Sequence, residues 1–598
     1  MNNNLNKAIN ALCLFLFFVL ISFPVFQILS RYISFFSIPA SQEIVQHMTL
    51  WIGFVGAVIA ARSNKLLSVV REPVFNSKKS PPWSQFFVHI FSVSIVFVLS
   101  FSYLKMIQIG IQYPEYIAPF IPTWVAQSII PLGLILIWYQ MIITSSSDLR
   151  YRLFLAIFST VPTIVLYFWQ FPLANPLLLW TKVLFAIVLV AFGLPIFILL
   201  ASLSVFFFLS EPSDWATNYD LISTISDSAY RIVVSPTLAA IPIFTLAGYI
   251  LAESKISERL INFFKSSVGW VPGSTVLIVV LLCAFFTALT GGSGVTILAL
   301  GAILYPILIH DGYSERFSLG IITTAGSLGL LFPPSLPAII YSVTAGINPL
   351  ELFRQAFLPA IFLMSIMFFY GLYKRPQVRK IEKFDLSRAL ETANIAKWEI
   401  AIPVLIILSL FTGFATLVES AALLVLYVIS IELFIYKDIS MKDLPKIIIN
   451  CATLVGGVLI ILGFAMGFTG YLVDAQIPLK ILNYVQSTIS SKIIFLLALN
   501  ILLLIVGCLM DVFSAIIVVV PLIAPLAAYF GIDPFHLAII FIANLELGYI
   551  TPPVGMNLYL SSYRFDKDMP TIYNATLPFF FIRLIGVLLI TYIPLFFY

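Results

Sequence analysis

The chain has 598 residues, of which 61% are hydrophobic and 10% are charged, with a net charge of +5 and a mean hydropathy of +1.06. Soluble proteins carry about 25% charged residues, so this composition excludes a soluble globular protein and predicts a polytopic membrane protein. Apolar runs of roughly 20 residues recur along the chain and predict an all-α protein, because a membrane barrel would show alternating segments of about 10 residues.

The cysteines and histidines carry no spacing typical of metal ligands. All four cysteines lie in apolar segments, which predicts small buried hydrophobic side chains, and the four histidines are scattered. No metal site built from cysteine or histidine is therefore expected. The modest net charge indicates basic loops rather than a nucleic-acid surface, so no nucleic-acid partner is expected.

The first third of the chain contains five candidate spans, at about 10–30, 44–61, 85–111, 124–144 and 153–170. The first is too long for the apolar core of a signal peptide and is interpreted as a membrane helix. The loop after the second span is basic and predicts a cytoplasmic side, which places the N-terminus in the cytoplasm. We therefore predict a small four-helix membrane domain at 1–150 and a linking membrane helix at 151–177.

From about residue 178 the apolar stretches become longer and are interrupted by glycine and proline. A basic loop that begins at Lys374 and runs to Arg388 separates two hydrophobic blocks and also predicts a cytoplasmic side. We predict one large domain at 178–598, built from two inverted repeats at about 178–373 and 395–598.

Each block carries one copy of the same pattern, from Thr287 to Pro337 and from Val506 to Asn557. Aligning the double prolines sets one register, which also matches further residues: Pro306 with Pro525, Gly312 with Gly531, and Gly329 with Gly548. Breaks in a membrane helix persist only where the freed backbone is buried or lines a cavity. Paired breaks in corresponding halves point to the binding site of a transporter.

The first copy predicts a helical hairpin whose tip lies at membrane depth, followed by a broken helix. The tip is rich in glycines and hydroxyls, and the break contains a double proline: Gly291, Gly292, Ser293, Gly294 and Thr296 at the tip, and Gly329, Pro333, Pro334 and Ser335 at the break. Exposed carbonyl and hydroxyl oxygens there would suit Na⁺ or hydrogen bonds to an anion. Close helix packing through small residues is the alternative.

The second copy brings a carboxylate, Asp511, to the corresponding hairpin tip beside Gly507. A charge near the bilayer centre costs at least about 2.5–3.5 kcal/mol on insertion scales, and cation coordination would offset that cost. The alternative is a cap on the second helix of the hairpin. Further oxygen ligands surround the second break, which contains Gly548, Thr551, Pro552, Pro553 and Asn557.

Other charged residues in apolar sequence are open to two interpretations. Glu419 and Glu546 are functional, or they are helix caps or satisfied structural carboxylates, whereas Asp474 is expected to mark the end of a span. The arginines of the large domain are expected at the membrane interface: Arg354, Arg564 and Arg583. No phosphate-binding loop and no catalytic motif is found, so we expect neither nucleotide nor enzymatic activity.

Several segments resemble the large membrane subunit of tripartite ATP-independent periplasmic (TRAP) transporters: AIPIFTLAGYILAESKISERLINF, GGSGVTILALGAILYPILIHDGYSERFSLG, GLLFPPSLPAIIYSVTAGI, TLVESAALLVLYV and LGYITPPVGMNLYLSS. The first 150 residues resemble the small subunit more weakly, through Arg31-Tyr32, Leu50-Trp51 and Ala60-Ala61-Arg62. The chain therefore resembles a natural fusion of the two subunits.

The resemblance implies a Na⁺-driven importer of a small organic acid in the bacterial inner membrane. A periplasmic substrate-binding protein would deliver the acid, and the transport domain would move like an elevator against a scaffold. Sodium and substrate would lie around the two hairpin tips and the two breaks, with Na⁺ at Gly292, Ser293, Asp511 and Thr551. Related proteins often carry a second serine or an alanine-rich continuation where this chain has Gly294-Val295-Thr296.

The alternatives are an ion-coupled transporter that works without a binding protein, a polytopic membrane enzyme, or a channel. The first predicts uptake without a soluble partner, the second predicts polar catalytic clusters in long loops, and the third predicts uncoupled flux. The substrate stays open among sugar acids, dicarboxylates and keto acids.

Overall fold

The computed structural model describes residues 2–33, 38–66, 82–119, 121–168, 179–210, 218–376, 384–489, 491–552 and 555–596. This part of the chain is helical apart from one short antiparallel pair, β1 (Tyr116–Ala118) and β2 (Ile121–Pro122). Among the described residues, 12 helices are long and apolar enough to cross a membrane, or up to 14 if each of two bent helix pairs is one span. The prediction of an all-α polytopic protein is confirmed.

The helices form two compact units, and each consists of two separate stretches of the chain. Unit 1 is Met1–Pro242 with Ile448–Lys480, and unit 2 is Ile243–Ile447 with Ile481–Tyr598. Three helices contain the boundaries between these stretches: α11 (Ala240–Glu253), α21 (Leu444–Asp474) and α22 (Ile477–Thr488). The two units that the contacts define therefore differ from the domains predicted along the sequence, whose boundaries lie at 150 and 178. The predicted domain boundaries stay a prediction.

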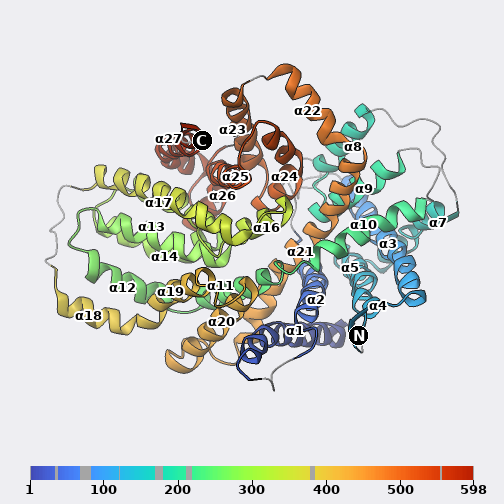
Figure 1. The fold of residues 1–598 in the computed structure, drawn as a ribbon, viewed down its shortest axis with the longest axis horizontal. Helices are drawn as coiled ribbons and strands as arrows, with labels where there is room; N and C mark the ends of the chain where they lie inside the picture. The colour runs from blue at the N-terminus through green and yellow to red at the C-terminus, as the bar shows by residue number, and fades with distance from the viewer. Residues whose placement is uncertain are drawn as a thin grey trace. The chain divides into compact units, whose positions relative to one another are not determined.

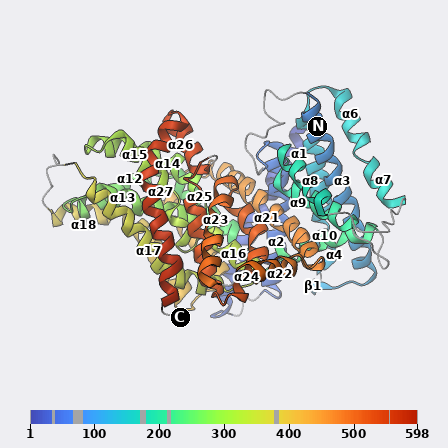
Figure 2. The same ribbon diagram turned by 90° about the horizontal axis from the view of Figure 1, so that it is seen from above.

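Unit 1 contains the helices of the first third of the chain and three that follow them: α1 (Asn2–Ser30), α2 (Ser41–Arg62), α3 (Pro82–Gln112), α4 (Thr123–Gln127), α5 (Ile129–Ser145), α6 (Leu149–Phe158), α7 (Val161–Phe168), α8 (Leu179–Ala191), α9 (Ile196–Leu209) and α10 (Asn218–Val233). All five predicted spans coincide with candidate membrane helices, although the end of the fifth lies outside the described residues. Helices α6 and α7 lie against α3 (Figure 2).

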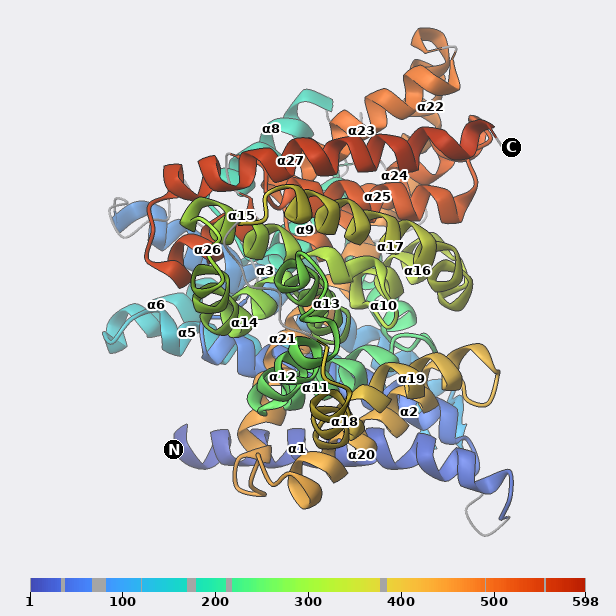
Figure 3. The same cartoon turned by 90° about the vertical axis from the view of Figure 1, so that its left-hand side faces the viewer.

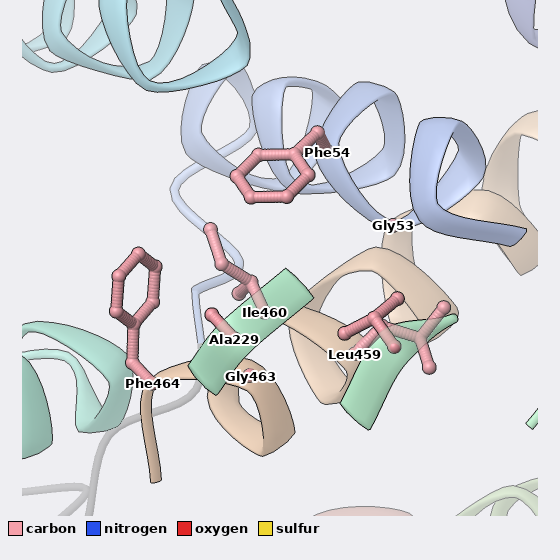
Figure 4. Close-up of a pocket in the computed structure, with 8 residues that line it drawn as sticks. Gly53, Phe54, Ala229, Leu459, Ile460, Gly463 and Phe464 are labelled. Atoms are coloured by element: carbon pink, nitrogen blue, oxygen red, sulfur yellow. The ribbon is translucent and has the colours of Figure 1, made fainter. Parts of the chain in front are cut away.

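Within unit 1, α2 and α21 cross at two glycines that let the backbones touch. A Cβ on Gly456 would lie 2.2 Å from the carbonyl carbon of Gly56. Figure 4 shows Gly53 on α2 and Gly463 on α21 beside a cavity of about 10 Å³, which has an apolar lining. A water needs about that volume and also polar partners, so this cavity is a packing gap between helices rather than a binding site.

Unit 2 contains the remaining helices and both copies of the glycine and proline pattern: α12 (Ile256–Val268), α13 (Ser274–Thr290), α14 (Ser293–His310), α15 (Glu315–Ala325), η2 (Leu328–Leu331), α16 (Leu336–Ala345), α17 (Pro349–Tyr373), α18 (Leu386–Ile395), α19 (Lys397–Phe411), α20 (Leu417–Ser430), η3 (Ile431–Ile435), α23 (Lys492–Leu509), α24 (Val512–Tyr529), α25 (Pro534–Gly548), α26 (Met556–Phe565), α27 (Met569–Tyr592) and η4 (Ile593–Phe596). In Figure 1, α13 lies between α14 and α17.

Both copies show the same order of a hairpin, a broken helix and a long helix. The order is α13–α14, then α15 and α16, then α17 in the first copy, and α23–α24, then α25 and α26, then α27 in the second. The matched prolines Pro306 and Pro525 both lie inside the second arm of a hairpin. The matched glycines Gly312 and Gly531 follow these arms with φ of 85° and 64°, a conformation that favours glycine.

The two long helices of the repeats contact each other inside unit 2. Helix α27 packs on α17, α15 and α25, and α25 packs in turn on α23. Figure 3 shows α27 running along α25. This layer supports the hairpins and broken helices of both copies.

Candidate functional site

The first hairpin turns at Gly291 and Gly292, as predicted. Helix α13 ends at Thr290, and Gly291 follows with a φ of 67°. A Cβ on Gly291 would lie 2.5 Å from the Cβ of Leu336, so the tip presses on the start of α16. Gly292 has open space instead, since the nearest atom to its Cβ, on Val295, would be 3.9 Å away.

The Ser293 hydroxyl at this tip contacts the second broken helix. The Ser293 Oγ donates to the Asn557 Oδ1 at 2.7 Å, and the Asn557 Nδ2 donates to the backbone oxygen of Thr323 at 3.1 Å. Gly294 allows this approach, because a Cβ there would lie 2.6 Å from Leu560. Two predicted site residues that are far apart in sequence therefore touch, and all of their polar partners are buried.

The first break frees backbone carbonyls, and side chains from other helices satisfy them. The Thr287 Oγ1 donates to the oxygen of Gly326 at 2.7 Å and lies 2.7 Å from the Thr296 Oγ1. The Arg583 guanidinium donates to the oxygen of Thr324 at 3.4 Å. These bonds hold a non-helical backbone inside the membrane, which requires such internal partners.

The residues of the break itself pack against the first hairpin. A Cβ on Gly329 would lie 2.2 Å from the oxygen of Ala284 on α13, so this position tolerates only glycine without displacement. Pro333 and Pro334 lie between η2 and α16, and Ser335 directly precedes α16. Within the described part of the chain, the buried Ser335 hydroxyl has no hydrogen-bond partner.

The second hairpin has a carboxylate where the first has glycine and serine. Asp511 caps α24, since its Oδ1 accepts the N–H groups of Phe513 at 3.0 Å and Ser514 at 3.2 Å, and its Oδ2 accepts the Ser514 hydroxyl. The backbone N–H of Val512 donates to the Tyr549 hydroxyl at 2.6 Å. The cap interpretation is thus confirmed, whereas cation coordination by Asp511 stays a prediction.

The second break contacts its own hairpin through two glycines. A Cβ on Gly548 would lie 2.5 Å from the backbone of Gly507. The backbone N–H of Gly555 donates to the oxygen of Cys508 at 3.2 Å, and the Thr551 hydroxyl donates to Leu547. Pro552 ends the described part of this break, and Pro553 lies outside the described residues.

The predicted residues thus meet in three places. Ser293 contacts Asn557 of the second break. Thr296 and Gly329 both lie against Thr287 of α13. Gly507, on the hairpin whose second helix Asp511 caps, lies against Gly548. Among the residues that the structure describes, no hydrogen bond joins Ser293 to Asp511. Hydroxyl, amide, carboxylate and carbonyl oxygens are hard ligands, so the donor set fits a cation such as Na⁺.

The prediction that Arg583 lies at the membrane interface is wrong. Its side chain is fully buried and forms an ion pair with the equally buried Glu546, and it also donates to the Ser327 hydroxyl at 3.1 Å. A charge in an apolar helix is stable only beside a partner, and α25 supplies one. Arg354 and Arg564 are exposed.

Glu419 and Asp474 both lie at the ends of helices. Glu419 forms a capping box with Thr416 at the start of α20. Asp474 is the last residue of α21, so it marks the end of a span as predicted. All four cysteines are buried, also as predicted.

Sequence reasoning missed Thr287, Thr323 and the ion pair of Glu546, although an arginine and a glutamate in apolar runs are a recognisable signal for a buried pair.

Two models of known protein families match the chain. A family model described as tripartite ATP-independent periplasmic transporter, DctM component, matches residues 183–596, and one for the DctQ component matches residues 7–151. The chain belongs to this family. It is a fused TRAP permease, which joins both membrane components in one chain and is a multi-pass membrane protein.

Named relatives support the assignment. The C4-dicarboxylate TRAP transporter large permease protein of Pseudomonas aeruginosa is 34% identical over 60% of this chain and 84% of its own length. The isethionate TRAP transporter permease protein DctMQ of Oleidesulfovibrio alaskensis is 29% identical over 62% of this chain and 59% of its own length. Among solved structures, the YdaH transporter of Alcanivorax borkumensis matches 63% of this chain and 88% of its own at 15% identity, with a TM-score of 0.47. Both matching family models describe transporter components, so the chain is a component of a transporter rather than an enzyme.

Proposed function

We propose that this permease imports a small organic acid across the bacterial inner membrane, driven by Na⁺ and supplied by a periplasmic substrate-binding protein. The observation that carries the proposal is a set of buried polar contacts around the first hairpin. Ser293 donates to Asn557, which donates to the backbone oxygen of Thr323, and Thr287 donates to the backbone oxygen of Gly326 at the first break. This network places hard oxygen ligands at the tip of a hairpin and beside a broken helix, as an ion and substrate site requires.

The mechanism we propose is an elevator movement with the N-terminus in the cytoplasm. Both hairpins and both broken helices belong to unit 2, so a movement of that unit as a body would carry the whole site. Na⁺ would bind at Gly292, Ser293, Asp511 and Thr551. The basic loops after α2 and α17 support the orientation, because positive residues favour the cytoplasmic side.

The substrate class follows from the family and from the relatives. Relatives are named for C4-dicarboxylates and isethionate, which are both small organic anions. We therefore propose that the substrate is a small organic anion. The classes that the sequence leaves open are dicarboxylates, keto acids and sugar acids. Arg583 is not its ligand, because Glu546 already neutralises it.

The test is uptake of labelled acids into proteoliposomes that contain the full chain, with and without a periplasmic binding protein. We expect uptake only with the binding protein and an inward Na⁺ gradient. Uptake without the binding protein would indicate a transporter that works alone, flux without a gradient requirement would indicate a channel, and no uptake of any acid would refute the proposal.

Substitutions at Asp511 distinguish a capping role from a role in ion binding. Asparagine caps helices as well as aspartate, so Asp511→Asn retains the cap and removes only the charge. If Asp511 binds Na⁺, Asp511→Asn and Asp511→Ala both raise the half-saturating Na⁺ concentration, by about tenfold for a loss of 1.4 kcal/mol, and more than Ser293→Ala does. Unchanged Na⁺ dependence in Asp511→Asn would leave only the cap.

A further inference from the structure

An apolar cavity of about 220 Å³ lies beside the first break, entirely within unit 2. Helix α13 supplies Ala284 and Ala288 to its wall, and the break supplies Phe332 and Pro333. Helices α17 and α19 complete the wall. The cavity therefore shares Pro333 with the break on which the proposed site depends.

The chemistry of the wall decides what class of ligand fits. Every lining residue is aliphatic, aromatic, proline or methionine, and none carries a charge or a hydrogen-bonding side chain. A buried water needs two to four polar partners, and a cation or a carboxylate needs more, so the wall suits none of them. Apolar cavities of about 150 Å³ bind benzene-sized molecules, so this one accepts a hydrocarbon group.

The mouth of the cavity lies on an apolar surface that two helices share. Phe357 on α17 and Ile407 on α19 line the cavity and are 40% and 41% exposed. Beside them, Leu358 is 74% and Leu408 is 56% exposed, and α17 is long and apolar enough to span the membrane. In a membrane protein, such exposed apolar faces contact lipid, so the cavity is continuous with the lipid interface.

We propose that this cavity binds one acyl chain of a membrane phospholipid. The chain enters between Phe357 and Ile407 and packs against Phe332 and Pro333, behind the first break. Phospholipid is the occupant because the bilayer presents acyl chains at the mouth. Methylene groups inside the cavity also make dispersion contacts with the wall atoms, which an empty cavity would lack. The proposal does not depend on the transported substrate.

The test uses the full chain in nanodiscs that contain phosphatidylglycerol with a photoreactive diazirine on its acyl chain. After irradiation, mass spectrometry of peptides locates the label. We expect the peptides that contain Phe332 and Phe357 to be labelled at least about fivefold more than the peptide of Ile501, which is 53% exposed on α23 and does not line this cavity.

Two filling variants and one control make the test specific. Ala288→Phe fills the cavity from α13, and Ile407→Trp fills it from the mouth, where a larger side chain is compatible with folding. Both variants should reduce labelling of the Phe332 peptide at least about fivefold, and Leu358→Trp, on the same lipid-facing surface, should leave it unchanged. Labelling that is uniform over all exposed helices, or insensitive to both fillings, would overturn the proposal. So would labelling by a small apolar photoprobe where the phospholipid gives none.

Discussion

The ion pair of Arg583 with Glu546 places two opposite charges at full burial inside unit 2. Removing one partner leaves an uncompensated charge, which typically costs about 3–5 kcal/mol. We therefore expect Glu546→Gln and Arg583→Met each to lower the thermal unfolding temperature of the purified protein strongly. Replacing both by apolar residues, Glu546→Leu with Arg583→Met, should restore most of the stability, because no charge is then left alone.

The double variant also tests what else Arg583 does. Its guanidinium donates to the oxygen of Thr324 at the first break, and Met cannot replace that bond. We expect the double variant to fold and still to transport more slowly than the native protein. A double variant as unstable as either single one would show that the pair is not an independent unit.

A second charged cluster, around Arg259, predicts a pH dependence. Arg259 donates to Glu399 and forms an ion pair with Asp438 at 2.8 Å, and its guanidinium lies 3.8 Å from the ring centre of Tyr436. Burial raises the pKa of Asp438, but the Arg259 guanidinium and the hydrogen bond from the backbone N–H of Lys255 outweigh it and hold the pKa below its ordinary value of 3.8. A lowered pKa stabilises the fold at higher pH, and the stabilisation is lost as pH falls through the folded-state value.

The measurement is thermal unfolding of the native protein and of Asp438→Asn between neutral pH and pH 3. At neutral pH the variant should unfold at a lower temperature. The gap between the two should begin to narrow below pH 3.8, where the unfolded chain takes up the proton. It should close as the pH falls through the lower folded-state pKa, where the native Asp438 is protonated as well. The exposed Glu391→Gln serves as a control and should show no such gap. A gap that is independent of pH would assign the effect to packing.

At the scale of elements, glycine and proline predicted the breaks well because they act on their own backbone. Both hairpins and the first broken helix lie where the pattern of Gly291, Pro333 and Asp511 placed them. The partners of the freed carbonyls were not predictable in the same way. Thr287, Asn557 and Arg583 reach the break from other helices, and only the packing of those helices determines which side chain arrives.

The matched glycines Gly329 and Gly548 lead to a prediction about the contact between each broken helix and its hairpin. A Cβ on Gly329 or Gly548 would lie 2.2 Å or 2.5 Å from the backbone of a hairpin, so Gly329→Ala and Gly548→Ala must separate the two elements. We expect each to cost about 1–3 kcal/mol of unfolding free energy, the usual range for overpacking. Gly292→Ala, whose Cβ has 3.9 Å of space, should leave the unfolding temperature near the native value. Equal effects at all three positions would remove steric contact as the explanation.

At the scale of the whole molecule, the order of the chain and the compact units differ. The apolar runs predicted the spans, since hydropathy is local, and the family matches at 7–151 and 183–596 follow the chain order. Unit 1 nevertheless contains α8, α9, α10 and most of α21 together with the first helices. This grouping depends on contacts between distant residues, such as Gly56 with Gly456, which no local pattern reports.

The glycine crossing in unit 1 therefore tests whether the two units have separate roles. Gly456→Ala places a methyl group against the backbone of Gly56, and we expect a loss of about 1–3 kcal/mol in stability. Gly470→Ala, on the same helix with no atom within 4 Å of its Cβ, should be neutral or stabilising by up to about 1 kcal/mol. If the ion site lies wholly in unit 2, the half-saturating Na⁺ concentration for uptake should be the same in both variants, because unit 1 contributes none of the proposed ligands. A shifted Na⁺ dependence in Gly456→Ala alone would show that the packing of unit 1 is coupled to the ion site. Unit 1 could then no longer be described as a rigid scaffold.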